Sequence, residues 1–131
     1  MLPIIPTPKS ANDSGEILQY QATITPSENF RSAVDVFCDY ADRLGIKFTC
    51  TLAGRISIKP DSSLQSGAYR LIADENGITL LASDATGANH AFATLLQIIK
   101  YEESTAEYIM VPGCNVTDYA DCSYRGLMVD L

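Results

Sequence analysis

The feature of this sequence that most constrains its fold is a turn signal between two short apolar runs. Asp74-Glu75-Asn76-Gly77 separates residues 68–73 from residues 78–82. Asn and Gly tolerate the positive φ angles that a tight turn requires. The pattern predicts a β-hairpin over residues 68–82, and a hairpin pairs its two strands antiparallel.

A first amphipathic helix is predicted from about Pro26 to Leu44, because apolar residues recur there at spacings of three and four. Thr25 and Glu28 form a capping-box pattern at its start, and Gly45 supplies a stop at its end. The predicted buried face consists of Phe30, Ala33, Val34, Phe37, Ala41 and Leu44.

A second amphipathic helix follows the hairpin. Ser83-Asp84 offers its N-cap, and the helix is expected to fade near Lys100. The predicted buried face consists of Ala85, Ala88, Phe92, Leu95, Leu96 and Ile99.

Further strands are predicted on both sides of the first helix. Residues 17–25 alternate between apolar and polar side chains, as a half-buried strand does. Residues 46–52 and 55–59 are rich in aromatic and β-branched side chains, and Ala53-Gly54 between them predicts a second hairpin. A polar loop follows over residues 60–67.

The C-terminal stretch is less regular. Residues 107–111 read as a strand, residues 113–123 as loop, and residues 125–131 as a buried strand. Taken together, the elements predict an α+β fold of two layers, in which two helices pack on one face of a mostly antiparallel sheet.

Length and charge narrow the function. A chain of 131 residues with 47% hydrophobic side chains suits one compact domain. The formal charge of -7 has the wrong sign for holding nucleic-acid phosphates or anionic lipid, so we expect neither nucleic-acid nor membrane binding. The opening residues lack the basic and apolar regions of a signal peptide.

The four cysteines are not arranged as a zinc or redox motif, because none of them forms a close CxxC pair. Cys38 falls on an apolar helix face and Cys50 inside a predicted strand, which predicts buried free thiols. Cys114 and Cys122 lie in the looser segment, where the sequence leaves open both free thiols and a disulfide between them.

No catalytic site is visible in the polar residues. The single histidine, His90, excludes an HExxH metal site and is expected on a helix surface or at an interface. Glu102-Glu103 reads as a solvated turn, and Asp118, Asp121 and Asp130 as capping or loop residues. Gly87 belongs to no phosphate-binding loop, and neither the cysteines nor His90 form a metal-binding motif. We therefore expect neither a metal nor a cofactor. Asn115-Val116-Thr117 matches a glycosylation acceptor, a pattern that is common by chance.

Two runs nevertheless resemble a known family. They are GAYRLIADENGITLLASDATGANHAFATLLQII (residues 67–99) and VPGCNVTDYADCSYRGLMVDL (residues 111–131), together with the opening LPIIPTPKS. The chain resembles the non-catalytic N-terminal domain of glycoside hydrolase family 20, the β-N-acetylhexosaminidases, followed by the first strand of their catalytic barrel. The resemblance implies an accessory domain over residues 1–112 and a linker with the first barrel strand over residues 113–131.

The resemblance also implies what the parent protein does. Family 20 enzymes remove terminal N-acetylglucosamine or N-acetylgalactosamine by a retaining route in which the acetamido oxygen of the sugar replaces the enzyme nucleophile. The Asp-Glu pair that serves this route belongs to a later barrel strand, so no catalytic residue is assigned and this chain is expected to be inactive alone. The family implies an extracytoplasmic location.

One functional residue is carried over by the resemblance. Arg125 matches the family arginine that hydrogen-bonds hydroxyls of the terminal sugar, a task that suits the fixed fork of guanidinium donors. The implied partners are the catalytic barrel and an amino-sugar glycan. A stand-alone carbohydrate-binding or interaction module is the alternative. The apolar end at residues 127–131 would form an exposed strand edge, which predicts a homodimer through this tail.

Overall fold

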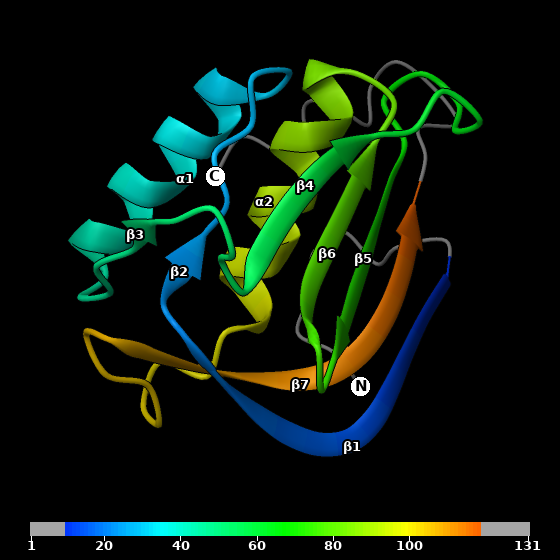
Figure 1. The fold of residues 1–131 in the computed structure, drawn as a ribbon. Coiled ribbons are helices and arrows are strands. Elements are labelled where there is room, and N and C mark those ends of the chain that lie inside the picture. Colours follow the sequence, from blue (N-terminus) through cyan, green and yellow to red (C-terminus); the bar gives the residue numbers. More distant parts are fainter. Residues whose placement is uncertain (1–9, 119–131) are drawn as a thin grey trace.

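The computed structural model describes residues 10–118, which form a curved sheet and two helices (Figure 1). In chain order the elements are β1 (Ser10–Gln21), β2 (Thr23–Ile24), α1 (Arg31–Arg43), β3 (Thr49–Cys50), β4 (Ile56–Pro60), β5 (Tyr69–Asp74), β6 (Gly77–Ala82), α2 (Ala85–Ile98) and β7 (Tyr108–Asp118).

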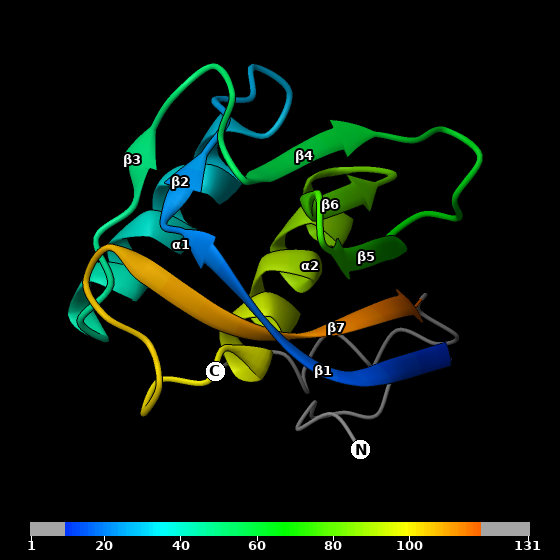
Figure 2. The same cartoon turned by 60° about the horizontal axis from the view of Figure 1, so that its bottom comes forward.

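The strands form one mixed sheet in the order β1-β7-β5-β6-β4-β2-β3. In this order, the neighbours β1, β7, β5 and β6 pair antiparallel in long ladders. The neighbours β6, β4, β2 and β3 pair parallel. Both helices cover the same face of the sheet (Figures 1 and 2). The predicted α+β fold with two helices on one face is confirmed.

One length of chain belongs to both halves of the sheet. β1 pairs with β7, and after the single residue Ala22 the chain continues as β2 between β4 and β3. The Ala22 N–H donates to the carbonyl of Glu107 (2.7 Å), and the Ala22 carbonyl accepts from the N–H of Thr49 (2.9 Å). The strand predicted over residues 17–25 is therefore present but divided. The sheet must curl to accommodate it, and Figure 2 shows α2 inside the curve.

Helix α1 begins later than predicted, so the start at Pro26 is wrong. The Thr25 hydroxyl, expected to cap the helix, accepts instead from the N–H of Gly54 (3.0 Å). Ser27 accepts from the N–H of Phe30 (3.2 Å), which holds residues 27–30 in a turn ahead of the helix. Tertiary hydrogen bonding has therefore overridden a local capping signal.

The end and the buried face of α1 largely follow the sequence. The chain leaves the helix at Gly45, whose φ of +95° favours glycine. The predicted apolar residues are buried with one exception, because Leu44 is 48% exposed.

The hairpin predicted over residues 46–59 is wrong, because β2 lies between β3 and β4. Ile24 in β2 is opposite Cys50 on one side and Ile56 on the other, and all three strands run in the same direction. The connection over residues 51–55 therefore crosses the end of β2. It does so closely, since a Cβ on Gly54 would lie 2.5 Å from the carbonyl carbon of Ile24.

The hairpin predicted over residues 68–82 is confirmed as β5 and β6, in which Asp74 is opposite Gly77. The Asp74 carboxylate accepts from the N–H of Asn76 (2.9 Å), a local bond that favours the turn. Positive φ occurs at Gly77 (+140°) and not at Asn76.

The N-cap predicted for α2 is also confirmed. The Asp84 carboxylate accepts from the N–H of Gly87 (2.8 Å) and of Gly67 (3.0 Å) and from the hydroxyl of Ser66 (3.0 Å). These bonds, with that from Gly87 first, hold the pKa of Asp84 below its ordinary value. The helix ends at Ile98, close to the predicted fading at Lys100. Of its predicted face, Ala85 is exposed and Leu96 is only half-buried.

Gly87 has a packing role in the first turn of α2. A Cβ at this position would lie 2.2 Å from the carbonyl oxygen of Ala68, so only glycine lets the helix approach the start of β5 this closely.

Strand β7 is longer than predicted. The strand expected over residues 107–111 continues to Asp118, so the loop expected over residues 113–118 is wrong. These residues are held between β1 and β5, with Val116 opposite Ala11 and Leu71. The strand predicted over residues 125–131 and the homodimer assigned to it lie outside the described residues. The division after residue 112 stays a prediction.

The core centres on Phe37 of α1, whose side chain is 1% exposed. Its ring centroid lies 4.7 Å from that of Phe92 in α2 and 5.0 Å from that of Phe48, ahead of β3. Three segments far apart in sequence are therefore joined by one aromatic side chain.

We expect Phe37→Ala to lower the free energy of unfolding by about 3–5 kcal/mol, because it removes both ring contacts and leaves a cavity. The neighbouring Val36 is 59% exposed, and Val36→Ala is expected to change the free energy by less than about 0.5 kcal/mol. Urea denaturation of both variants checks this. Equal losses would show that Phe37 is not central to the core.

We expect Asp84→Ala to cost about 1 kcal/mol of stability at pH 7, because the N-cap is lost. The pKa of Asp84 is lower in the folded state, so its contribution is present above the unfolded pKa and is lost as the pH falls through the folded value. Urea denaturation at pH 7 and pH 3 should show the difference from wild type shrinking at pH 3, with Glu102→Ala as an exposed control. A difference that is the same at both pH values would contradict this account.

Candidate functional site

The polar residues singled out from the sequence do not converge within residues 10–118. His90 is half-buried on α2, Glu102 and Glu103 are exposed on the turn after α2, and Asp118 is buried at the end of β7. Arg125, which is predicted to bind the sugar, lies outside the described residues, as do Asp121 and Asp130. The described part of the chain therefore brings no acid and base pair together.

Residues 10–118 offer neither a metal-binding cluster nor a membrane-spanning helix. No three His, Cys, Asp or Glu residues in that part of the chain are grouped so that they could hold a metal ion. Neither of its two helices has the length and apolar character needed to cross a membrane.

The cysteines differ from expectation. Cys38 is half-buried on α1, but Cys50 is exposed on β3, so the prediction that both are buried is wrong for Cys50. Both are free thiols. Cys50 is exposed because β3 is the edge strand of the sheet. The disulfide considered between Cys114 and Cys122 involves a residue outside the described part.

The strongest candidate is an apolar groove of about 490 Å³ between the outer sides of α1 and α2. On the side of α1 it is lined by Val36, Tyr40 and the C-cap residue Leu44, which are 59%, 40% and 48% exposed. From α2 and the turn behind it the lining includes Leu96 and Tyr101. Exposed apolar side chains gathered in one place mark a contact surface.

The floor of the groove is continuous with the hydrophobic core. It is formed by the stacked rings of Phe37 and Phe92, which also belong to the core. Tyr101 is fixed beside it, because its hydroxyl donates to the carbonyl of Leu96 (2.5 Å). Burial raises the pKa of Tyr101 to about 12, so its hydroxyl stays neutral at physiological pH.

Sequence reasoning missed this groove, although a signal was present. Val36, Tyr40 and Leu44 are spaced by four, which places them on one stripe of a helix. That stripe is separate from the buried stripe of Ala33, Phe37 and Ala41. The sheet and α2 cover the buried stripe of α1. The outer stripe stays exposed within residues 10–118, so it is available to a further partner.

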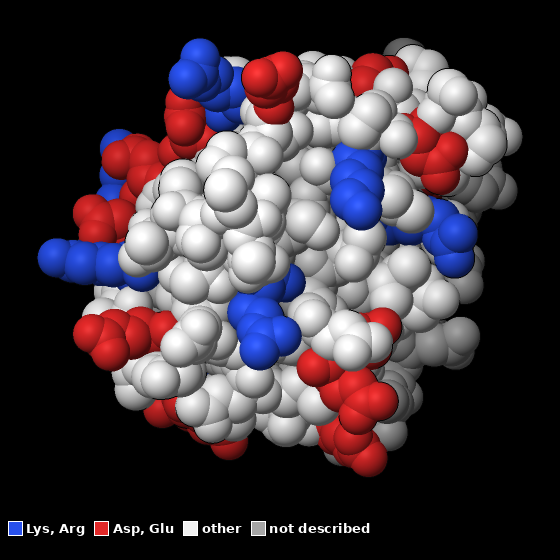
Figure 3. Space-filling model, viewed as in Figure 1, with Lys and Arg blue, Asp and Glu red and all other residues white. Residues whose placement is uncertain are grey.

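Charged side chains lie beside the groove along α1. Arg43 and Asp39 form an exposed ion pair (3.1 Å) one turn apart. Figure 3 shows acidic and basic side chains gathered at the edge of the molecule where α1 lies. A polar rim around an apolar centre is typical of protein interfaces.

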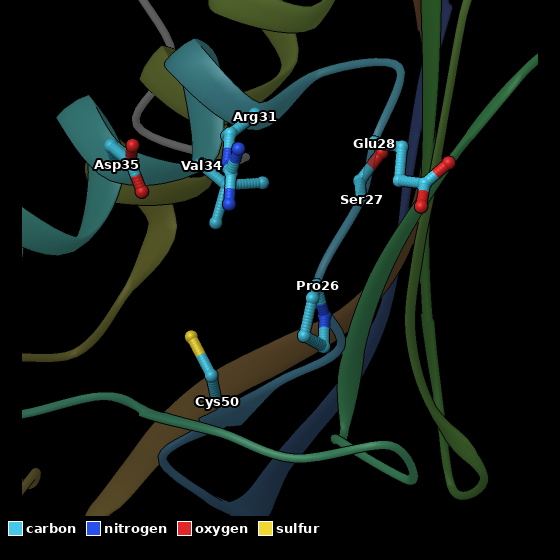
Figure 4. Close-up of a pocket in the computed structure, with 7 residues that line it drawn as sticks. All are labelled: Pro26, Ser27, Glu28, Arg31, Val34, Asp35 and Cys50. Carbon is cyan, nitrogen blue, oxygen red and sulfur yellow. The ribbon is translucent and has the colours of Figure 1, made fainter.

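A second cleft, of about 610 Å³, lies at the start of α1. Its walls are residues 26–28, Arg31, Val34 and Asp35, and Cys50 of β3. Figure 4 shows the carboxylates of Glu28 and Asp35 on opposite sides of this cleft. They are not placed as a general acid and base pair, which must converge on one substrate.

Comparison with known proteins gives one family. The sequence matches the family described as Glycosyl hydrolase family 20, domain 2, over residues 1–119. The chain is 36% identical over 75 residues to a beta-hexosaminidase of Vibrio furnissii, and that match covers 57% of this chain and 12% of the relative. It is 26% identical to a beta-hexosaminidase of Porphyromonas gingivalis, covering 98% of this chain and 18% of the relative.

Solved structures agree with the fold. The GH20 exo beta-N-acetylglucosaminidase of Vibrio harveyi, in complex with N-acetylglucosamine, superposes with a TM-score of 0.85 and 28% identity, covering 94% of this chain and 20% of that chain. The N-acetyl-beta-hexosaminidase of Streptomyces plicatus superposes with a TM-score of 0.74 and 23% identity, covering 92% and 27%. The chain thus spans about a fifth of these proteins.

Proposed function

We propose that this chain is the accessory domain of a β-N-acetylhexosaminidase. The premise is that the chain belongs to the family glycosyl hydrolase family 20, domain 2. The observation that carries this proposal is the family match over residues 1–119. It is supported by the relatives, which bear the name beta-hexosaminidase and are several times longer than this chain.

The intact enzyme would remove terminal N-acetylglucosamine or N-acetylgalactosamine from glycans. The proposed route is retaining and substrate-assisted, with the acetamido oxygen of the sugar as nucleophile. No described residue of this chain is given a catalytic role in it. The chain alone would therefore be inactive, and an extracytoplasmic location is proposed with the activity.

The groove between α1 and α2 is the surface that we assign to the catalytic barrel. Val36, Tyr40 and Leu44 would be covered by it, which removes apolar area from water at roughly 25 cal/mol per Å². The packed rings of Phe37 and Phe92 suit a permanent contact, because side chains already buried in the core lose little further freedom on binding. The domain would then support the barrel without touching substrate.

Arg125 is the one residue to which we assign a sugar contact. A guanidinium holds two adjacent oxygens in a fixed geometry, which a lysine ammonium does not. This role requires the rest of the subsite, so the chain alone would bind sugar poorly.

We expect these 131 residues to release no nitrophenol from nitrophenyl N-acetylglucosaminide. A longer protein that includes the catalytic barrel encoded by the parent gene should release it. Measuring both side by side tests the proposal. Activity of the short chain that survives rigorous purification would overturn it.

The assignment of the groove is tested in the extended protein with Val36→Asp. A carboxylate buried at the interface should cost about 1–3 kcal/mol and lower the melting temperature by several degrees. In the 131-residue chain the same change should cost less than about 0.5 kcal/mol, because Val36 is exposed there. Leu52→Asp, on an apolar residue that is 91% exposed and lies outside the groove, is the matched control. Equal effects of the two variants in the extended protein would argue against the groove as the barrel contact.

For Arg125 we expect Arg125→Ala to lower kcat/KM of the extended enzyme by about 10–100-fold, the cost of losing charge-assisted hydrogen bonds to the sugar. Arg43→Ala removes an exposed arginine that pairs with Asp39 and should leave kcat/KM unchanged. An unchanged kcat/KM in Arg125→Ala would remove the residue from the subsite.

A further inference from the structure

We propose that Cys38 and Cys50 are an oxidisable pair, and that a disulfide between them joins α1 to the edge strand β3. This covalent site does not depend on the function proposed above. It rests on the positions of the two side chains, their difference in exposure, and the short edge strand that carries one of them.

Cys50 is directed toward the helices. It is opposite Ile24 in the parallel pair of β3 and β2, and residues paired in this way share a face of the sheet. Ile24 is fully buried on the face that the helices cover, so the Cys50 side chain projects on that face. Figure 4 shows its sulfur pointing into the cleft toward the part of α1 that carries Val34.

Cys38 lies on the same side of α1. Val34 and Asp35 line the cleft that Cys50 also lines. Cys38 follows them by four and three residues, which places it one helical turn further along the same stripe. Its side chain is half-buried and packs against the core. Both cysteines therefore lie on the sides of α1 and β3 that are turned toward each other.

The electrostatics agree with this placement. The pKa of the Cys38 thiol is raised to about 11, first by burial, then by the charge of Cys50, and then by that of Asp35. Asp35 is only one helical turn from Cys38, yet Cys50 acts on Cys38 more strongly. This order of causes agrees with the facing positions of the two side chains.

The reaction needs a small-molecule disulfide as oxidant, for example oxidised glutathione. The exposed Cys50 thiolate attacks one sulfur of the oxidant, whose S–S bond breaks and releases a first thiol. The Cys38 thiolate then attacks Cys50 Sγ in the mixed disulfide and releases a second thiol. The protein loses two electrons, the oxidant gains them, and the two protons leave on the released thiols.

The structure also sets the pH dependence of the second step. Burial, the first cause of the raised Cys38 pKa, persists when Cys50 has become a mixed disulfide, so the Cys38 thiolate is scarce at neutral pH. Ring closure should therefore accelerate as the pH rises from 7 to 9. β3 contains two residues and lies at the edge of the sheet, so it can adjust to the geometry of a disulfide.

The test is to incubate the full chain with oxidised glutathione at pH 8.5, block the remaining thiols and map tryptic peptides by mass spectrometry. Cleavage after lysine and arginine places Cys38 in residues 32–43, Cys50 in residues 48–55, and Cys114 with Cys122 in residues 101–125. A Cys38–Cys50 disulfide links the first two peptides, whereas a Cys114–Cys122 disulfide stays within the third.

We expect the linked pair of peptides in the monomer, its loss on reduction or in Cys50→Ser, and its persistence in Cys122→Ser. The oxidised chain should melt roughly 5 °C higher, because the bond closes a short loop in the unfolded state. Glutathione retained on Cys50 while Cys38 stays alkylatable would overturn the proposal. So would a linkage found only between two chains, or only within residues 101–125.

Discussion

The continuity of β1 and β2 through Ala22 is the constraint on which the rest of the structure depends. A strand that pairs with β7 on one side and enters between β3 and β4 on the other forces the sheet to curl. Helix α2 lies inside this curve and buries one side of its surface against the sheet. Gly87 permits the close approach, since any side chain there would collide with the Ala68 carbonyl.

The same geometry explains why the two helices differ. α2 lies inside the curve and has seven buried residues, whereas α1 packs at its opening and has four. Its outer stripe of Val36, Tyr40 and Leu44 consequently meets water instead of protein. The groove is thus a product of the sheet curvature, and the rings of Phe37 and Phe92 make it continuous with the core.

What the sequence predicted correctly depends on short-range physics. The turn at residues 74–77 and the cap at Asp84 are made by hydrogen bonds between near neighbours, and both were predicted. The hairpin at residues 46–59 failed because β2, distant in sequence, separates β3 from β4. Thr25 carries a capping pattern but bonds to Gly54, which no local rule reveals. The groove was missed because its stripe has meaning only once the other face of α1 is known to be buried.

The pairing of β1 with β7 has a consequence for how the domain is made. Ser10 is opposite Thr117, so the first described strand finds its only neighbour in the last one. Pairing two strands so far apart in sequence costs loop-closure entropy. Local contacts do not offset this cost at an early stage of folding. On the ribosome, the hairpin of β5 and β6 and the helix α2 can form while β1 still lacks a neighbour. The domain reaches its native sheet only after Asp118 has left the exit tunnel, so the edge of β1 is open to wrong partners throughout most of its synthesis.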